Sequence, residues 1–503
     1  MTNRVLAPER PFIPSVPGVV VWLRGLLERE ALPIVIVALW LGLLGFSLPL
    51  LVVEDSWLSF VDGRLVAQHG LPHVDTLTFW SLGHPWVDQQ WGAHLALYEA
   101  MAHGGLIAAL LLAVAFIAAA LTVLAVAARK LGASARSVAI GVALPLLGAP
   151  WLAQLRTQTL ALPFFAAVYA LLALDSRRPS RRVLWVLPLL VVWANLHGSV
   201  ALGAVLAALY GLGLVRRRDT RGRGALLVLG SPLTLLVSPY GFRLVDYYHL
   251  MLFHPPLAQY VVEWRPPAVQ APTVAFFLSA FGAAALWGGH RRVLTSFEKW
   301  AVPLLLLSAL TAVRNGVWFE LALAVSLPRL LDGAWPSRIR LTDGVRRLNL
   351  VLGSLALAAV IGLFAYQAAR GPAWLDKSHP SAAAASAVAA AAGRDGIVLS
   401  DDLHADWLLW QKPSLAGRIA YDVRFELFDA HELKQLDRLE RASHPAWSRC
   451  GAIASVVTFP DRRISRLVRA ENVFAPGSRT IVDTKDFVAV AQPAAPASRC
   501  RRL

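Results

Sequence analysis

Two adjacent carboxylates, Glu54 and Asp55, follow directly after the first long apolar run of the chain, Pro33–Val53. A carboxylate is costly to hold where an apolar helix meets water, so those found at such positions usually serve a function. Asp55 has a second carboxylate beside it and a long, tryptophan-containing segment after it, unlike an isolated acid at a helix end. We therefore select Asp55 as the first candidate functional residue.

Isolated polar groups recur in short segments between later apolar runs. These segments are Arg156-Thr157-Gln158, Asn195-Leu196-His197-Gly198, Ser238-Pro239-Tyr240-Gly241, Glu263-Trp264-Arg265 and Arg314-Asn315. If they lie at the same level as Asp55, they surround a polar cavity with carboxylates at one point and guanidinium groups at others. A guanidinium group suits phosphate, because its planar fork offers charge-assisted and often bidentate donors. Each lone arginine is equally consistent with a side chain that reaches lipid headgroups.

The elements that would hold these groups are membrane helices. Hydrophobic residues make up 56% of the chain and charged residues 16%, and the mean hydropathy is +0.54, which excludes an ordinary soluble domain. Apolar runs of helical length recur along most of the chain. We count eleven: Pro33–Val53, Leu106–Ala128, Ser137–Ala153, Thr159–Leu174, Val183–Ala194, Val200–Val215, Ala225–Val237, Val274–Trp287, Trp300–Ala312, Gly316–Leu331 and Leu348–Ala368.

The placement of basic residues predicts the orientation of these spans. Lysine and arginine concentrate at the N-terminus and then in alternate loops, within 129–136, 177–182, 216–223, 291–299 and 338–347. The intervening loops contain only lone arginines. This positive-inside pattern predicts a cytoplasmic N-terminus and an external tail from Arg370 onward. It also accounts for the net charge of +16 without nucleic acid, since the basic loops face anionic lipid.

The first external loop, 54–105, is too long to be a simple turn. Trp57, Leu58, Val61 and Leu65 recur at helical spacing and predict an amphipathic helix in the membrane interface. A second interfacial helix is expected to begin near Val87. The loop also contains further polar and aromatic residues: Asp62, Asp75, Trp80, His84, Trp86, Asp88, Trp91 and His94. The tryptophans are typical of an aromatic belt, Asp62 and Asp88 of solvated or capping residues, and the histidines of neutral interfacial side chains rather than metal ligands.

The alternating helix and strand patterns of the tail, 370–503, predict a small external α/β domain after the membrane domain, 1–369. Ser381–Ala392 and Glu426–Arg441 read as helices, and Gly396–Ser400, Arg418–Val423 and Ile453–Phe459 as strands. An acidic stretch follows the first strand, where open sheets often bind ligands, namely Asp401, Asp402, His404 and Asp406. We interpret it mainly as a solvated loop. The alternative is acceptor binding, with Trp407, Trp410 and Tyr421 stacking on sugar rings. Cys450 and Cys500 lie in this tail, where a disulfide is permitted but spacing does not establish one.

Several of these motifs resemble those of bacterial GT-C-type glycosyltransferases, the protein-mannosyltransferase-like superfamily. The first loop carries Glu-Asp-Ser-Trp (54–57), Gly-Leu-Pro-His-Val-Asp-Thr-Leu-Thr-Phe (70–79) and His-Pro-Trp-Val-Asp-Gln-Gln-Trp (84–91). The polar segments of the later loops, and Trp407–Trp410 with Gly417–Arg424, are similar in order to one largely uncharacterised branch. The likeness covers nearly the whole chain. One departure is Thr157, because related sequences often have proline between the arginine and the glutamine.

The resemblance implies transfer of a sugar, with inversion, from a polyprenyl-phosphate donor to an acceptor hydroxyl at the external face of the bacterial inner membrane. Asp55 would deprotonate the acceptor, which is an envelope glycan, lipid or protein, and Glu54 or Asp75 would assist it or hold a divalent metal. Arg156 and Arg314 would hold the lipid phosphate. Other residues would line the cavity or contact substrate: Asp75, Asp88, Gln158, His197, Tyr240 and Glu263.

Two other classes of protein fit parts of the sequence. A transporter or flippase of lipid-linked sugars would be expected to show inverted repeats and ionisable groups at mid-membrane depth. The charges cluster instead at one face, which favours chemistry at the interface. A non-catalytic protein of envelope assembly would bind through its tail, and Asp55→Asn would then be silent.

Overall fold

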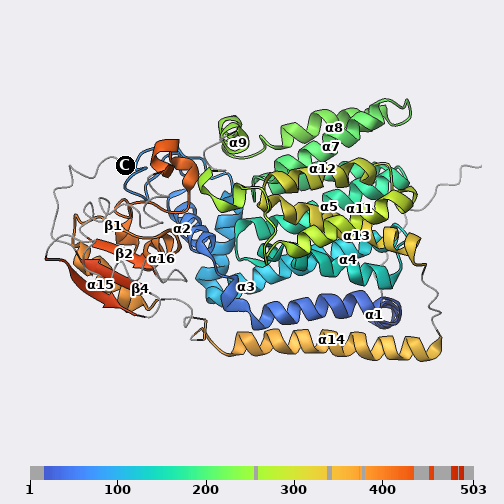
Figure 1. Cartoon of the computed structure of the whole chain (residues 1–503), viewed down its shortest axis with the longest axis horizontal. Coiled ribbons are helices and arrows are strands. Elements are labelled where there is room, and N and C mark those ends of the chain that lie inside the picture. The colour runs from blue at the N-terminus through green and yellow to red at the C-terminus, as the bar shows by residue number, and fades with distance from the viewer. Residues whose placement is uncertain are drawn as a thin grey trace, which may run out of the picture.

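Long apolar helices lie side by side at one end of the molecule, and a small sheet with its own helices lies at the other (Figure 1). The structure is a computed structural model. It describes residues 16–253, 259–336, 342–372, 374–375, 380–434, 453–457, 477–484 and 487–491. Cys450, Cys500 and the second half of the predicted helix Glu426–Arg441 lie outside these residues.

Each of the eleven predicted apolar runs is a helix or contains one. The helices are α1 (Val16–Phe46), α3 (Trp91–Lys130), α4 (Ala135–Gly148), α5 (Thr157–Arg177), α6 (Val186–Ala194), α7 (Val200–Val215), α8 (Arg221–Thr234), α11 (Val274–His290), α12 (Glu298–Thr311), α13 (Gly316–Ala334) and α14 (Asp343–Ala369). Among the described residues, α1, α3, α5 and α14 are long and apolar enough to cross a membrane. The count of eleven spans and their orientation remain predictions.

The centre and the edge of the bundle differ in how they bury apolar surface. Helix α13 is buried from Gly316 to Leu330, which places it at the centre. Helix α14 runs beside α1 at the border of the bundle (Figure 1) and exposes Leu348, Val351, Leu355 and Ile361. An apolar face of this length is stable in hydrocarbon but not in water, so it supports a membrane location for the bundle.

The first loop begins with α2 (Glu54–His69), the helix predicted from its apolar spacing. It packs against α3 and against α16 (Asp402–Gln411) of the tail. Gly63 permits this close packing, because a Cβ atom there would lie 2.2 Å from the backbone oxygen of His94. The second predicted helix begins at Trp91 rather than near Val87 and continues as α3, with a kink at Gly105, whose φ is 67°.

The tail contains α15 (Ala382–Ala392), α16 and a sheet of β1 (Val398–Leu399), β2 (Ile453–Val457), β3 (Arg479–Asp483) and β4 (Phe487–Ala491). The strand order is β1-β2-β4-β3. β1 and β2 are parallel, with Val398 opposite Ile453, and β2–β4 and β4–β3 are antiparallel. The predicted helix at 381–392 and the strands near 398 and 453 are confirmed. The predicted strand Arg418–Val423 is wrong, because within it only Ile419 forms bridges, to Thr78 and Val398.

Backbone hydrogen bonds attach the tail to the first loop. Gly417 N–H donates to Leu77, and the N–H groups of Phe79 and Trp80 donate to Ile419 and Ala420. Arg64 of α2 donates to the carbonyl oxygens of Leu409 and Trp410 at 2.7 and 3.0 Å. The tail therefore lies directly on the loop that contains Asp55, although the two are far apart in sequence.

Candidate functional site

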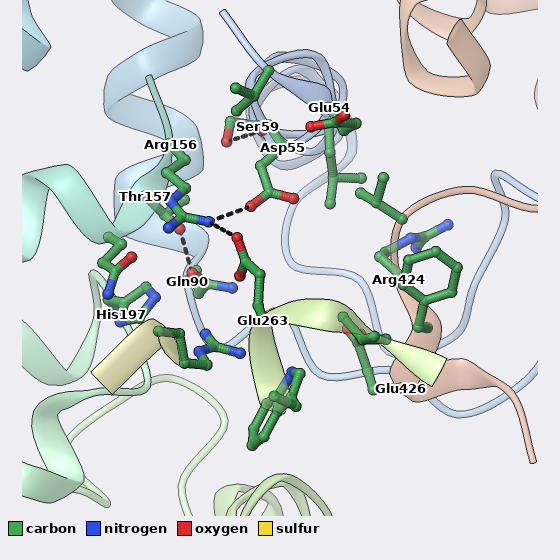
Figure 2. A pocket seen from close by; sticks show the side chains of 18 of the residues that line it. Glu54, Asp55, Ser59, Gln90, Arg156, Thr157, His197, Glu263, Arg424 and Glu426 are labelled. Carbon is green, nitrogen blue, oxygen red and sulfur yellow. Dashed lines mark hydrogen bonds and ion pairs between the residues drawn. The ribbon is translucent and has the colours of Figure 1, made fainter. Parts of the chain in front are cut away.

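A cavity of about 450 Å³ lies where the bundle, the first loop and the tail meet (Figure 2). Its walls come from the starts of α2 and α5, the turn between α6 and α7, the loops around Glu263 and Arg314, and tail residues near Glu426. Seven of the residues selected from the sequence line it: Glu54, Asp55, Arg156, Gln158, His197, Glu263 and Arg314. The structure thus brings together groups from five separate segments of the chain.

The starts of α2 and α5 place Asp55 beside Arg156. Ser56 Oγ donates to the backbone oxygen of Leu155, and Leu155 N–H donates to Leu51 at 2.7 Å. Ser56 Oγ also accepts the N–H of Val53 at 2.9 Å, which caps the first turn of α2. These bonds fix the two helix starts to each other, so Asp55 and the adjacent Arg156 project into the same space (Figure 2).

The guanidinium group of Arg156 is buried, but only one of its nitrogens has a hydrogen-bond partner among the described residues. Its Nη1 lies 2.8 Å from Glu263 Oε1 and 3.5 Å from Asp55 Oδ2, and its side chain is 6% exposed. Its Nε and Nη2 are buried and have no hydrogen-bond partner among the residues that the structure describes. Buried donors without partners cost free energy, and those of a charged group cost most. Nε and Nη2 form one edge of the guanidinium plane, the edge that can bind two oxygens of one anion.

The two carboxylates beside Arg156 have pKa values shifted in opposite directions. Burial raises the pKa of Asp55, and the charge of Glu263 raises it further, although Arg156 and Arg314 oppose both. The pKa of Glu263 is lowered, because the attraction of Arg156 and Arg314 outweighs its burial. Pairs of acids whose surroundings separate their pKa values often divide the roles of proton acceptor and fixed charge. Here Asp55 is suited to accept a proton and Glu263 to remain ionised.

Arg314 reaches the cavity from the turn before α13. Its guanidinium lies 4.5 Å from the centre of the Trp264 ring, a cation–π contact. The N–H of Val313 donates to Arg265 at 2.9 Å, which holds this turn against the loop that contains Glu263. Arg314 therefore supplies a second positive charge to the cavity, and this charge acts on both Asp55 and Glu263.

His197 offers a neutral hydrogen-bond donor to the cavity. Its Nδ1 accepts the backbone N–H of Ser199 at 3.1 Å, which leaves the proton on Nε2. Burial, and the charges of Arg314 and Arg156, lower the pKa of His197 well below its usual value. Gln158 also lines the cavity and is buried.

Glu54 lies on the side of Asp55 away from Arg156 (Figure 2). Burial raises its pKa, and the neighbouring negative charges of Asp55 and Glu263 raise it further. It lines the cavity, but among the described residues it forms no salt bridge. The geometry therefore gives Asp55 the position nearer to the guanidinium groups.

Three residues selected from the sequence lie outside the cavity wall. Asp75 is fully buried; it accepts bonds from Leu77, Thr78 and Ser81 and from Arg424 Nη2 at 2.8 Å. Asp88 is buried against His94, with 3.0 Å between Oδ1 and Nδ1. The hydroxyl of Tyr240 donates to the backbone of Pro72 at 2.8 Å. In this structure, therefore, Asp75, Asp88 and Tyr240 are not among the residues that line the cavity.

Asp62 and Asp88 were expected to be solvated or capping residues, and the solvated alternative is wrong. Both are buried, and His94 lies 3.8 Å from Asp62 and 3.0 Å from Asp88. Asp88 Oδ1 accepts the N–H of Gln90 at 3.1 Å, directly before α3, as a capping residue does. Burial raises the pKa of Asp62 to about 8, against the attraction of His94. Histidine and two carboxylates thus form a buried contact between the first loop and α3.

The tail supplies one wall of the cavity, which the sequence interpretation missed. Arg424, Phe425 and Glu426 line it, and Arg424 and Glu426 lie across the cavity from His197 (Figure 2). Burial raises the pKa of Glu426 to about 7. A signal was present, since Gly417–Arg424 was one of the motifs similar to GT-C sequences, but nothing in the sequence indicated that it reaches the first loop.

Other tail residues selected from the sequence do not form an exposed sugar platform. Trp407 and Tyr421 are 1% exposed, and Trp80 stacks on Tyr421 with ring centres 5.8 Å apart. Asp401 caps α16 by accepting the N–H of His404, and Asp406 is buried. Buried Trp407 and Tyr421 are therefore not exposed for stacking on a sugar ring, and buried Asp406 is not part of a solvated loop. Tyr421 packs the junction between tail and first loop through Trp80.

The proposed metal ligands also fail to converge. Within the described ranges, no group of three or more His, Cys, Asp or Glu side chains could hold a metal ion. The carboxylate of Asp75 is occupied by Arg424 and by donors of its own turn. Asp55 and Asp75 therefore do not fit a shared divalent metal, and we route no step through one.

Comparisons with known proteins identify the fold. No protein-family profile matches the sequence, and no curated protein sequence matches it. Among solved structures, ArnT from Cupriavidus metallidurans bound to undecaprenyl phosphate superposes with a TM-score of 0.52 at 15% identity, over 96% of this chain and 99% of that one. The same protein in the apo state gives 0.47 at 14% identity, over 89% and 94%. The chain therefore shares its overall fold with this ArnT structure.

Proposed function

We propose that this chain transfers a sugar from a polyprenyl-phosphate donor to an acceptor hydroxyl in the cavity beside Asp55. The observation that carries the proposal is the pairing of Asp55 with Arg156, a buried guanidinium whose Nε and Nη2 have no partner among the described residues. Neither atom is exposed to the cavity here, so a phosphate group would satisfy both donors once the side chains around them move aside. ArnT, which shares the fold, was solved with undecaprenyl phosphate.

The residues of the cavity divide the reaction between them. Arg156 and Arg314 bind the phosphate and stabilise the negative charge that develops on it as the sugar–oxygen bond breaks. Asp55 takes the proton of the acceptor hydroxyl while that oxygen attacks the anomeric carbon from the opposite side. The acceptor oxygen gains the glycosidic bond, the phosphate oxygen keeps the bonding electrons, and the sugar inverts. His197 and Gln158 supply neutral hydrogen bonds to the substrate.

The experiment is transfer from membranes loaded with radiolabelled polyprenyl-phosphate sugars. We expect labelled product from the wild type, none from Asp55→Asn with donor still bound, and weaker donor binding in Arg314→Ala. A general base typically contributes about 10²–10⁴-fold to the rate, so Asp55→Asn should reduce the rate of transfer at least about 100-fold. No transfer from any donor, with Asp55→Asn behaving like the wild type, would reject the enzyme in favour of a transporter or an assembly protein.

A further inference from the structure

Glu263 occupies a position that a donor phosphate would need. Its Oε1 lies 2.8 Å from Arg156 Nη1, within normal hydrogen-bond distance, whereas Asp55 Oδ2 lies at 3.5 Å. The only short bond that the Arg156 side chain forms among the described residues is thus to Glu263. The guanidinium is tied to a carboxylate of the chain itself.

The charges of the cavity make this contact a competitor for phosphate. Arg156 and Arg314 supply two positive charges, and both act on Asp55 and Glu263, which supply two negative charges when ionised. With both carboxylates ionised, these four groups have no excess positive charge for a phosphodiester. Of the other charged residues that line the cavity, Glu54 and Glu426 are acidic and Arg424 is paired with Asp75 and Asp422. Either one carboxylate must take up a proton or one must move away.

The structure distinguishes which group can move. The side chain of Arg156 is 6% exposed, whereas those of Glu263 and Asp55 are 41% and 45% exposed. Asp55 belongs to the first turn of α2, which the bonds of Ser56 hold in place. Glu263 sits in a short 3₁₀ turn, Val262–Trp264, whereas Arg156 precedes α5 directly and is enclosed by its neighbours. Rotation of the Glu263 side chain costs little burial, while displacement of Arg156 would move a buried side chain.

We propose that Glu263 is a placeholder anion, which holds the Arg156 guanidinium between turnovers and is displaced from it by the donor phosphate. This role rests on the proposed function, because it requires that Arg156 binds phosphate. Glu263 returns to Arg156 as the polyprenyl phosphate leaves, which speeds release of that product. It is a positioning residue and takes no proton from the substrate.

The test is a double-mutant cycle read by binding of farnesyl methyl phosphate, a phosphodiester with one negative charge at neutral pH. Glu263→Gln keeps the shape of the side chain and removes its charge, so the competitor is weakened. We expect the Kd to fall about five-fold, which corresponds to about 1 kcal/mol, and the dissociation rate to fall with it. In an Arg156→Gln background the same substitution should change the Kd less than about two-fold, because there is no guanidinium to release.

Glu99→Gln is the control, since it removes one exposed carboxylate of α3 that does not line the cavity. Its Kd should stay within about two-fold of the wild type. A Glu263→Gln variant that binds the probe equally or more weakly would overturn the placeholder and assign Glu263 to orienting Arg156. A probe that fails to bind the wild type, or binds Arg156→Gln as tightly, would instead reject the proposed phosphate site and the placeholder with it.

Discussion

Arg424 should hold the tail against the first loop, and its removal should separate them. Its Nε and Nη2 lie 2.9 and 2.6 Å from Asp422 Oδ2, and Nη2 lies 2.8 Å from Asp75 Oδ1. The guanidinium also lies 4.5 Å from the centre of the Trp86 ring. Arg424→Met keeps most of the side-chain volume and removes this charge from between two buried carboxylates.

The free-energy cost of Arg424→Met depends on the hydrogen bonds that Asp75 and Asp422 retain without the guanidinium. Breaking a buried ion pair typically costs about 3–5 kcal/mol. Asp75 retains bonds from Leu77, Thr78 and Ser81, so most of the cost falls on Asp422. Burial raises the pKa of Asp422 against the attraction of Arg424, so loss of Arg424 would raise this pKa further and favour uptake of a proton, which limits the cost. We take the lower figure, about 3 kcal/mol, which raises the opening equilibrium of this contact about 100-fold.

Hydrogen exchange at the amides that join the tail to the loop measures this opening. Phe79, Trp80 and Gly417 donate the joining bonds, and their exchange should accelerate about 100-fold in Arg424→Met. Arg394→Met changes an exposed arginine of the same tail and should alter these rates less than about two-fold. Equal rates in the two variants would refute the reasoning that the buried ion pairs, rather than the backbone bonds alone, hold the tail in place.

Three further outcomes are expected. Asp55 must be ionised to act as a base, and its pKa is raised, so kcat/KM of the wild type should increase with pH until the pH passes the pKa of Asp55. Glu263→Gln removes a negative charge that raises the pKa of Asp55, so the pH profile of kcat/KM should shift to lower pH. A profile that does not shift would show that the observed titration is not that of Asp55. Gly63→Ala should destabilise the packing of α2 on α3 by about 1–3 kcal/mol, seen as a lower Tm, while Gly42→Ala, where a Cβ meets nothing within 4 Å, should not. Glu54→Gln should retain most transfer activity, measured against Asp55→Asn, since Glu54 lies away from Arg156; equal losses would make the two carboxylates a functional pair.

The helices and part of the cavity could be predicted because their signals are local. Apolar runs of helical length specify α3 or α13 without knowledge of their neighbours. Asp55, Arg156 and Arg314 could be grouped because each lies at a turn on the side predicted to be external. The resemblance to GT-C sequences rested on such local motifs, and the shared fold with ArnT supports it.

The remaining features depend on partners far away in sequence. Asp75 and Asp55 are both acidic residues of the first loop, and the sequence does not distinguish their environments. In the structure Arg424, 349 residues later, binds Asp75 inside the protein. The cavity wall formed by the tail depends on backbone hydrogen bonds between residues 77–80 and 417–420. Such bonds do not require particular side chains, so the sequence does not reveal them. Burial of Asp62 likewise requires His94 from α3, which the spacing within α2 does not reveal.

The most direct measurement of the central claim is an experimental structure of Asp55→Asn with an intact polyprenyl-phosphate sugar bound. The account predicts phosphate oxygens within hydrogen-bond distance of Arg156 Nε and Nη2, the sugar between them and residue 55, and Glu263 turned away from the guanidinium. Donor phosphate bound elsewhere, with Glu263 still on Arg156, would contradict it.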